Sequence, residues 1–263
     1  MKTIKRLVIK IGTSTLTHKT GLLNVQRFKK FVKVVADIKN TGIEVIIVSS
    51  GAIGLGLSKL KLGTKTDDIS TKQAAATVGQ CELMALYDKY FAKHNQVVAQ
   101  ILLTKNIVDN HIEKQNLRNT FNRLFEFKVI PIINENDSIA IEEIKFGDND
   151  TLSAIIASLC DADASIILSD IDGLYSKDPN RYRDAGKISL VTEINDEIKA
   201  LGSDSAGNQG TGGMITKITA AEICFHNSIS MAIINGNRPE NLQDVLAGKN
   251  IGTWFIKEEK NET

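Results

Sequence analysis

The sequence predicts an α/β fold in three layers, with a mostly parallel central sheet between two layers of helices. Short runs of apolar and β-branched residues alternate with longer segments whose apolar residues recur every three or four positions. The short runs are continuously apolar, as expected for parallel strands buried on both faces. Polar residues and glycines follow several of these runs directly, which is where open α/β sheets hold their ligands.

The chain begins with a βαβ unit. Residues 7–9 are predicted to form a buried strand, residues 25–38 an amphipathic helix and residues 43–48 a second buried strand. A right-handed crossover would bring Lys10 and Gly12 to the same sheet edge as Ser50 and Gly51. The glycines Gly51, Gly54 and Gly56 at that edge would let a ligand approach the backbone, and the alternative is that they only form turns.

The later elements continue the alternation. We expect further helices at 70–93, 110–125, 152–160, 192–201, 215–226 and 239–246, and further strands at 97–103, 129–133, 165–170, 230–236 and 252–256. Gly79, inside a long Ala-rich helix, would allow close contact with another helix, including one across a subunit interface. Pro131 cannot donate to a β-ladder, so its strand should lie near an edge or at a bulge.

The length of 263 residues and the 42% hydrophobic content favour a single compact domain at residues 1–257, followed by a charged tail at 258–263. The 32 Lys and Arg nearly balance the 31 Asp and Glu, so neither a nucleic-acid-binding surface nor a membrane-binding patch is indicated. No apolar stretch reaches membrane-spanning length, and Lys10 and Gly12 interrupt the first one well before it could serve as a signal-peptide core.

Cysteine and histidine usage points to a cytoplasmic protein without a dedicated metal site. The cysteines are far apart in apolar segments, so we expect small buried hydrophobes in a reducing compartment. The histidines show no metal-ligand spacing. These residues are Cys81, Cys160, Cys224, His18, His94, His111 and His226.

The segment 134–151 is the most informative part of the sequence. Asn134, Asn136 and Asp137 follow a buried strand, and Asp148, Asn149 and Asp150 precede the apolar helix from 152. One helix cap needs one acidic residue, and this segment has more polar groups than capping uses. We therefore expect a ligand site here, with loop and cap chemistry as the alternative.

Two further segments suit phosphate. Lys10 stands at a strand end before Gly-Thr-Ser, and the glycine-rich stretch 207–213 opens into a helix that carries Lys217. Backbone N–H groups at such a helix start, together with an ammonium group, form an anion site. Neither a Walker A loop nor a Gly-x-Gly-x-x-Gly motif is present. The turn at 171–179, rich in Asp and Gly with an aromatic residue and a lysine, could hold a ribose and base, or be a surface turn.

Together these regions predict phosphoryl transfer, in which positioning and charge neutralisation supply most of the catalysis. A carboxylate acceptor would already be ionised at pH 7, so no general base is needed. Asp137, with Asn134 and Asn149, could bind the ammonium group of an amino acid. The prediction requires the ammonium groups of Lys10 and Lys217 to enter one cavity.

The sequence resembles the glutamate 5-kinases of the amino-acid kinase family. The resemblance spans nearly the whole chain, and Asn-Glu-Asn-Asp followed by Gly-Asp-Asn-Asp is its most specific part. The segments that carry it are 8–14, 49–53, 134–137, 147–150, 172–175 and 210–214. It implies the amino-acid kinase fold and ATP-dependent phosphorylation of the glutamate side-chain carboxylate, the first step of proline biosynthesis.

The resemblance also implies residue roles. Lys10 and Lys217 would stabilise the transferring phosphoryl group, and Asp150 would hold both lysines. Glutamate would bind at Ser50, Gly51, Asn134, Asp137, Asp148 and Asn149. ATP would bind at Lys10, Gly12, Ser169, Asp170, Tyr175, Thr211, Gly212, Gly213, Met214 and Lys217. Mg²⁺ would arrive with the nucleotide. Feedback inhibition by proline and a homodimer or homotetramer are further expectations of the resemblance.

Two departures from the family pattern stand out. Many relatives have Thr-Asp where this chain has Ser169-Asp170, and many bacterial relatives carry a further C-terminal domain of the PUA type, whereas this sequence ends soon after Trp254. We therefore expect the short form. The rival acceptors are N-acetylglutamate, aspartate and carbamate, although Asp137 disfavours an acylated nitrogen. A non-catalytic sensor of nucleotide or amino acid is the other alternative.

Overall fold

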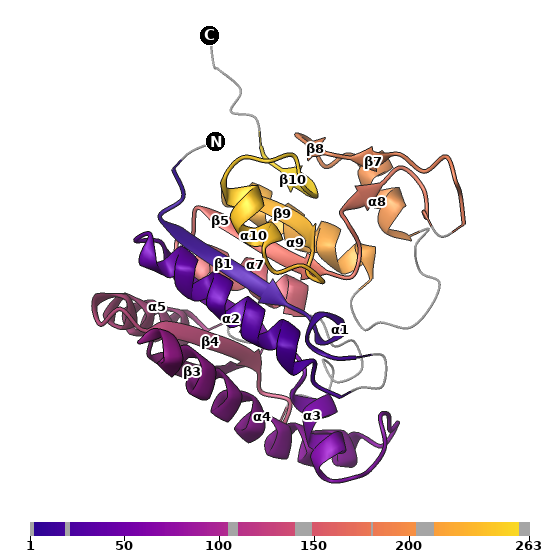
Figure 1. Cartoon of the computed structure of the whole chain (residues 1–263). Coiled ribbons are helices and arrows are strands. Elements are labelled where there is room, and N and C mark those ends of the chain that lie inside the picture. Colours follow the sequence, from indigo (N-terminus) through magenta and orange to yellow (C-terminus); the bar gives the residue numbers. More distant parts are fainter. Residues whose placement is uncertain are drawn as a thin grey trace.

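The computed structural model describes residues 3–18, 22–104, 110–139, 149–179, 181–203 and 213–257. Its main sheet has eight strands in the order β3-β4-β2-β1-β5-β9-β10-β8. The strands are β1 Arg6–Ile11, β2 Glu44–Ser49, β3 Val98–Leu103, β4 Ile130–Glu135, β5 Ala164–Ser169, β8 Leu190–Val191, β9 Ser230–Asn235 and β10 Thr253–Phe255. The six from β3 to β9 are parallel, and β10 pairs antiparallel to β9. The mostly parallel sheet is as predicted (Figure 1).

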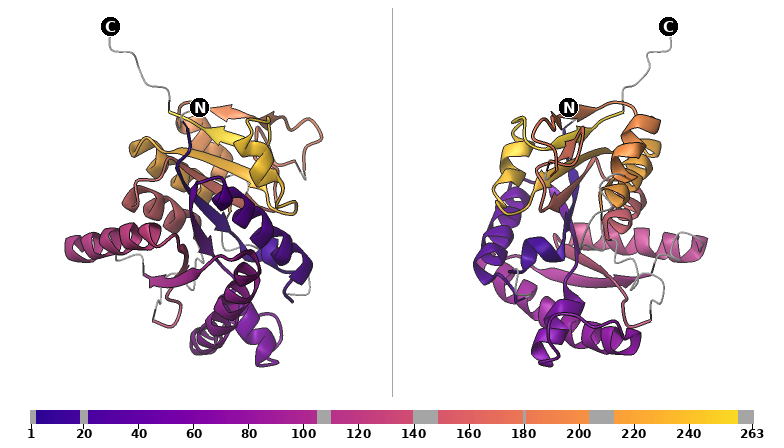
Figure 2. Two further views of the ribbon diagram at one scale, coloured as in Figure 1. Left: turned by 60° about the vertical axis from the view of Figure 1, so that its left-hand side comes forward. Right: turned by 90° about the vertical axis from the view of Figure 1, so that its right-hand side faces the viewer.

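Helices cover both faces of this sheet, which confirms the three layers (Figure 2). The helices are α1 Thr13–Leu16, α2 Val25–Asn40, α3 Ala52–Lys59, α4 Ile69–Phe91, α5 His111–Glu126, α7 Asn149–Leu159, α8 Asp196–Ser203, α9 Met214–His226 and α10 Asn241–Leu246, with a 3₁₀ turn at Ala92–His94. A small second sheet pairs β6 Leu174–Tyr175 with β7 Lys187–Ile188.

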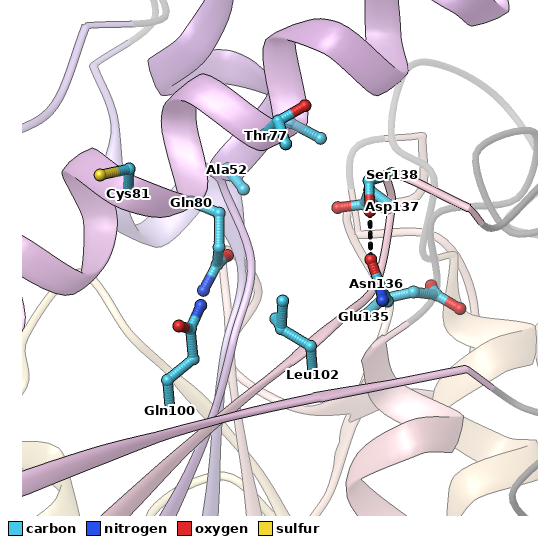
Figure 3. Close-up of a pocket in the computed structure, with 11 residues that line it drawn as sticks. Ala52, Thr77, Gln80, Cys81, Gln100, Leu102, Glu135, Asn136, Asp137 and Ser138 are labelled. Carbon is cyan, nitrogen blue, oxygen red and sulfur yellow. Dashed lines mark hydrogen bonds between the residues drawn. The ribbon is translucent and has the colours of Figure 1, made fainter.

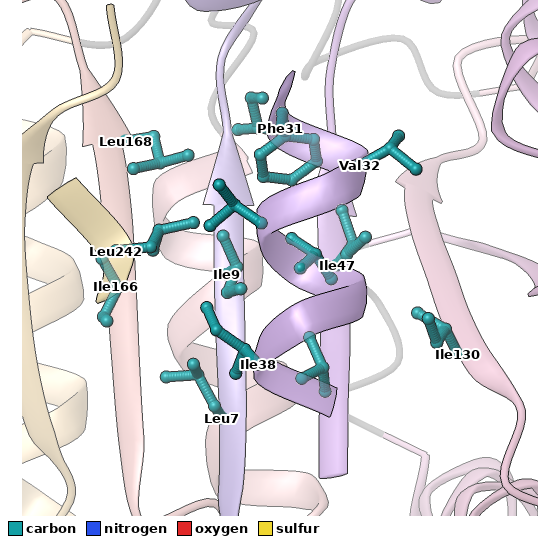
Figure 4. Packing of buried hydrophobic residues seen from close by; sticks show 14 of the residues in the cluster. Leu7, Ile9, Phe31, Val32, Ile38, Ile47, Ile130, Ile166, Leu168 and Leu242 are labelled. Carbon is teal, nitrogen blue, oxygen red and sulfur yellow. The ribbon is translucent and has the colours of Figure 1, made fainter. Parts of the chain in front are cut away.

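Side-chain alternation along β1 divides the core into two clusters. Leu7, Ile9 and Ile11 pack with α2, α4 and α10 on one face, as Figure 4 shows for Leu7 and Ile9 beside α2. Val8 packs with α5, α7 and α9 on the other. Because successive strand residues point to opposite faces, Lys10 falls on the α7 and α9 side. This register determines which helices can contribute side chains to meet Lys10.

The carboxyl ends of β1, β2, β4, β5 and β9 lie along one edge of the sheet. After β1 the chain adds β2 beside it, then β3 at the edge and β4 between β2 and β3, before it returns to β5 on the opposite side of β1. The boundary between β1 and β5 is therefore the point where strand order reverses, where open α/β sheets form a ligand crevice. Pro131 lies in β4, which is next to the edge strand β3 but is itself an interior strand, paired with β3 on one side and β2 on the other. The pairing with β2 involves only Ile132 and Ile133, so Pro131 stands beyond the end of that ladder, where its missing N–H is tolerated.

Helices α3 and α4 make the closest helix contact beside this edge. A Cβ added to Gly56 would lie 1.7 Å from the carbonyl oxygen of Ala75, and one added to Gly79 would lie 1.8 Å from that of Ala52. The predicted close contact at Gly79 is thus present, and it lies within the chain. Gly56 was expected to form a turn or to admit a ligand, but it lies inside α3. A glycine is required at this position because the backbone of α4 leaves no room for a side chain.

Candidate active site

Three charged side chains meet at the carboxyl edge of the sheet. The Nζ atom of Lys10 lies 2.6 Å from Oδ1 of Asp150, and Nζ of Lys217 lies 3.0 Å from Oδ2 of the same carboxylate. All three residues are buried, and Asp150 is 0% exposed. The contact predicted between Asp150 and both lysines is therefore present, although Lys10 and Lys217 are 207 positions apart in the sequence.

Each member of this lysine cluster, defined as Lys10, Asp150 and Lys217, comes from a different element. Lys10 is on β1, Asp150 is in the first turn of α7, and Lys217 is in the first turn of α9. A carboxylate in the first turn of a helix interacts favourably with the helix dipole. The two helices pack against the same face of the sheet that Lys10 points to, so the fold itself assembles the cluster.

Electrostatics keep Asp150 ionised. Burial alone would raise the pKa of its carboxyl group, but the positive charges of Lys10 and Lys217 outweigh burial and lower that pKa to about 2. The hydroxyl of Thr216 also lies 2.9 Å from Oδ2. The cluster therefore combines one negative and two positive charges in a site shielded from solvent, where electrostatic interactions are strong.

A second network joins four side chains beside the cluster. The Asn149 amide nitrogen lies 2.7 Å from the carbonyl oxygen of Ser49, 2.9 Å from the Ser50 hydroxyl and 3.0 Å from Oδ1 of Asn134. The Asn134 amide then donates to Oε1 of Gln80 at 2.8 Å. We call Asn149, Asn134 and Gln80 the amide relay. All three are largely buried, and Asn134 is only 2% exposed.

A pocket of about 280 Å³ opens next to the amide relay. Figure 3 shows Gln80 on one side of the pocket and Asp137 on the other. Asp137, which the sequence predicts to bind the ammonium group of the amino acid, therefore lines a cavity. The lining residues are Ala52, Ala76, Thr77, Gln80, Cys81, Gln100, Leu102, Glu135, Asn136, Asp137 and Ser138. They come from α3, α4, β3 and the end of β4, on the opposite side of β1 from β5.

The other predicted site residues fall into three groups. Gly12, Gly51, Ser169 and Asp170 lie at the carboxyl ends of β1, β2 and β5, and the Ser169 hydroxyl donates to Asp170 at 3.2 Å. Gly213 and Met214 begin α9, and Tyr175 lies in β6. Asp148, Thr211 and Gly212 lie outside the described residues.

Sequence reasoning did not identify every residue of this region. Gln80, Thr77 and Gln100 line the pocket, yet they come from a helix and an edge strand without any recognisable motif. The available signal was Gly79, because a glycine inside a helix marks a close approach. Cys81 was expected to be buried and is exposed at the pocket, whereas Cys160 and Cys224 are buried as expected.

No three His, Cys, Asp or Glu side chains in the described ranges gather as a metal centre would require. Among the helices in those ranges, none has the length and apolarity needed to span a membrane.

The family model described as "Amino acid kinase family" matches residues 5–235. The chain belongs to this family. A glutamate 5-kinase from Clostridium acetobutylicum is 50% identical over 260 residues, covering 99% of this chain and 97% of the relative. One from Listeria monocytogenes is 46% identical over 264 residues, covering 99% and 96%.

Solved structures confirm the family fold. A carbamate kinase from Giardia lamblia bound to AMP-PNP aligns with a TM-score of 0.68 at 17% identity, covering 98% of this chain and 100% of that one. The UMP kinase from Bacillus anthracis aligns with a TM-score of 0.63 at 16% identity, covering 97% of both chains. At such identities the likeness concerns the fold alone.

Proposed function

We propose that this protein is a kinase that transfers a phosphoryl group from ATP to the side-chain carboxylate of L-glutamate. The product is L-glutamyl 5-phosphate, in the first step of proline biosynthesis. The relatives that are 46–50% identical over nearly the whole chain carry the name of this activity. The observation that carries the proposal is the lysine cluster at the point where strand order reverses.

The lysine cluster supplies the charge that phosphoryl transfer needs. In the transition state, negative charge spreads over the oxygens of the transferring group, and positioned cations stabilise it. Lys10 and Lys217 take this role, and Asp150 is a positioning residue that holds both ammonium groups in one place. Asp150 holds the ammonium groups of Lys10 and Lys217 in position before ATP arrives, so little reorganisation is required during the reaction.

The acceptor needs no general base, because the carboxylate of glutamate is already ionised at neutral pH. Asp137 pairs with the ammonium group of glutamate, while Ser50, Gly51 and Asn149 hold the side-chain carboxylate that reacts. Asn134 acts through Asn149, to which its amide oxygen is bonded. The carboxylate oxygen then attacks the γ-phosphorus in line with the leaving ADP oxygen. Asp148 completes the proposed glutamate site.

ATP is assigned to the other side of β1. Its proposed contacts are Lys10, Gly12, Ser169, Asp170, Tyr175, Thr211, Gly212, Gly213, Met214 and Lys217. The start of α9 directs N–H groups toward the phosphates, which favours negative charge there. Mg²⁺ would enter with the nucleotide and keep several of its waters, and when bound it neutralises phosphate charge.

We also propose a cytoplasmic homo-oligomer, a dimer or a tetramer, that proline inhibits at a site overlapping the glutamate site. The support for inhibition by proline is the pocket that Asp137 lines, because the carboxylate of Asp137 suits the charged nitrogen of either amino acid. Sedimentation of the purified protein, and inhibition by proline at varied glutamate concentration, test the two parts. A monomer, or inhibition that excess glutamate cannot relieve, would contradict them.

The decisive experiment measures ADP release with ATP, Mg²⁺ and glutamate, and again without glutamate. Glutamate-dependent ADP release, with a product that hydroxylamine traps as a hydroxamate, is expected. Aspartate, N-acetylglutamate and carbamate should support less turnover. Preference for one of these would reassign the acceptor, and nucleotide binding without turnover would favour a sensor.

A further inference from the structure

The amide nitrogen of Gln80 is a buried donor for which the described part of the chain offers no hydrogen-bond acceptor. Gln80 is 8% exposed and lines the pocket that also contains Asp137. A buried donor without a partner costs about 1–3 kcal/mol, so proteins rarely keep one without a use. A ligand oxygen in the pocket would supply the missing acceptor.

The amide relay fixes which end of Gln80 faces the pocket. The carbonyl oxygen of Ser49 can only accept, so the NH₂ group of Asn149 must point to it. The second hydrogen of that NH₂ group then meets an oxygen of Asn134, since two NH₂ groups would repel each other. The NH₂ group of Asn134 in turn faces Oε1 of Gln80. Nε2 of Gln80 is left as the end that has no hydrogen-bond partner among the described residues.

We propose that Gln80 is a specificity-determining residue whose Nε2 atom donates a hydrogen bond to the α-carboxylate of the amino-acid substrate. This inference rests on the proposed function. Asp137 lines the same pocket and is assigned to the ammonium group, and the α-carboxylate is attached to the same carbon as that group. The side-chain carboxylate must instead reach the lysine cluster, and none of the cluster residues lines this pocket.

The position of Gln80 is rigid, as a specificity determinant requires. Gly79 precedes it, and there the backbones of α3 and α4 are in such close contact that no Cβ fits. Gln100 points its amide toward Gln80 from the edge strand β3 (Figure 3). The Gln100 side chain is exposed, so it can rotate aside when the substrate enters.

Gln80→Glu separates this role from a purely structural one. The introduced carboxylate still accepts from Asn134, but it presents an oxygen instead of an N–H group to the pocket. The KM for glutamate should rise about 10- to 100-fold at pH 8, the range expected for a hydrogen bond to a charged group, while the KM for ATP stays within about twofold. Gln115→Glu, at an exposed glutamine on α5, is the matched control and should leave both constants unchanged.

The pH profile provides a second readout. A protonated carboxyl group can donate again, so the ratio of the Gln80→Glu KM to the wild-type KM should fall as pH is lowered toward 5.5, because burial raises a carboxyl pKa. A wild-type glutamate KM in folded Gln80→Glu at pH 8 would overturn the inference. An elevated ratio that stays constant with pH would also overturn it, since that indicates a packing defect.

Asn134→Asp gives the same test without altering Gln80, in case Gln80→Glu does not fold. An aspartate there can only accept, so the Gln80 amide must turn its Nε2 toward it and its oxygen toward the pocket. The glutamate KM should again rise at least about 10-fold, and an unchanged KM would refute the relay. If wild-type protein shows no glutamate-dependent ADP release, the proposed function fails; if it does and these variants match it, only the inference fails.

Discussion

Asp150→Asn removes one negative charge and hardly changes the volume of the side chain. It leaves Lys10 and Lys217 without their shared carboxylate. Both lysines are more than nine-tenths buried, so each ammonium group loses a partner that solvent cannot replace. Breaking a buried ion pair from one side costs about 3–5 kcal/mol. We expect the free energy of unfolding at pH 7 to fall by about this amount.

Catalysis should fall as well, because misplacing positioned charges in a closed site costs about 100- to 1,000-fold in turnover. ADP release at saturating ATP and glutamate should give a kcat lowered at least about 100-fold, with both KM values within a few-fold of wild type. Asp161→Asn, at an exposed residue just beyond α7, is the control and should be silent. A variant that raises only KM would show that Asp150 does not organise the lysines.

The pKa of Asp150 adds a pH signature. Its folded-state value of about 2 lies below the ordinary 3.8, so ionised Asp150 contributes stability above pH 4 that is lost as pH falls toward 2. The difference corresponds to about 2 kcal/mol. Urea unfolding of wild type and Asp150→Asn should therefore give curves that approach each other below pH 4. A stability difference that stays constant between pH 6 and pH 3 would refute the ion-pair explanation.

The remaining predictions concern the two substrates and the helix contact. Lys10→Ala and Lys217→Ala should each raise the barrier to turnover by about 2–4 kcal/mol in steady-state ADP release, and full activity in either would exclude that lysine from the mechanism. Asp137→Ala should raise the KM for glutamate more than that for ATP, whereas equal changes would remove Asp137 from the acceptor site. Gly79→Ala should lower the free energy of unfolding by about 1–3 kcal/mol in urea titrations, because its new methyl group would lie 1.8 Å from a backbone oxygen on α3. Gly54→Ala, also in α3, has its nearest atom at 4.0 Å and should gain up to about 1 kcal/mol from helix propensity. Equal effects of the two alanines would contradict the close contact.

Most of the sheet could be predicted because its signals are local. The run before Ser49 was expected as a strand at 43–48 and occurs as β2 at Glu44–Ser49, and the Ala-rich helix expected at 70–93 is α4 at Ile69–Phe91. The missed elements depend on distant partners. Helix α3 contains Gly54 and Gly56, which disfavour helices, and its packing against α4 offsets that preference. Strand β8 is only two residues long and pairs with β10, more than sixty positions away.

Among the residues of the site, too, some could be predicted from local sequence signals and others could not. Lys10 and Lys217 each stand in a motif with its own polar signature, so their meeting could be predicted from a strand end and a helix start, whereas the role of Asp150 was predicted from the family resemblance. Gln80 has no such signature, because its role depends on an amide bonded to Asn134, which is 54 positions further along. A hydrogen-bond relay of this kind depends on side-chain orientations, and these are not encoded in residue spacing.

The two networks of the site share one structural origin, the first turn of α7. Asn149 is bonded to the end of β2 and to the amide relay, while the adjacent Asp150 holds the two lysines on the opposite side. Consecutive residues of one helix therefore set the distance between the proposed acceptor pocket and the charges proposed to bind phosphate. Phosphoryl transfer needs the attacking oxygen and the transferring group held to within a fraction of an ångström. A helix that begins with Asn-Asp provides this spacing from two neighbouring Cα positions, so neither network can shift without moving the other.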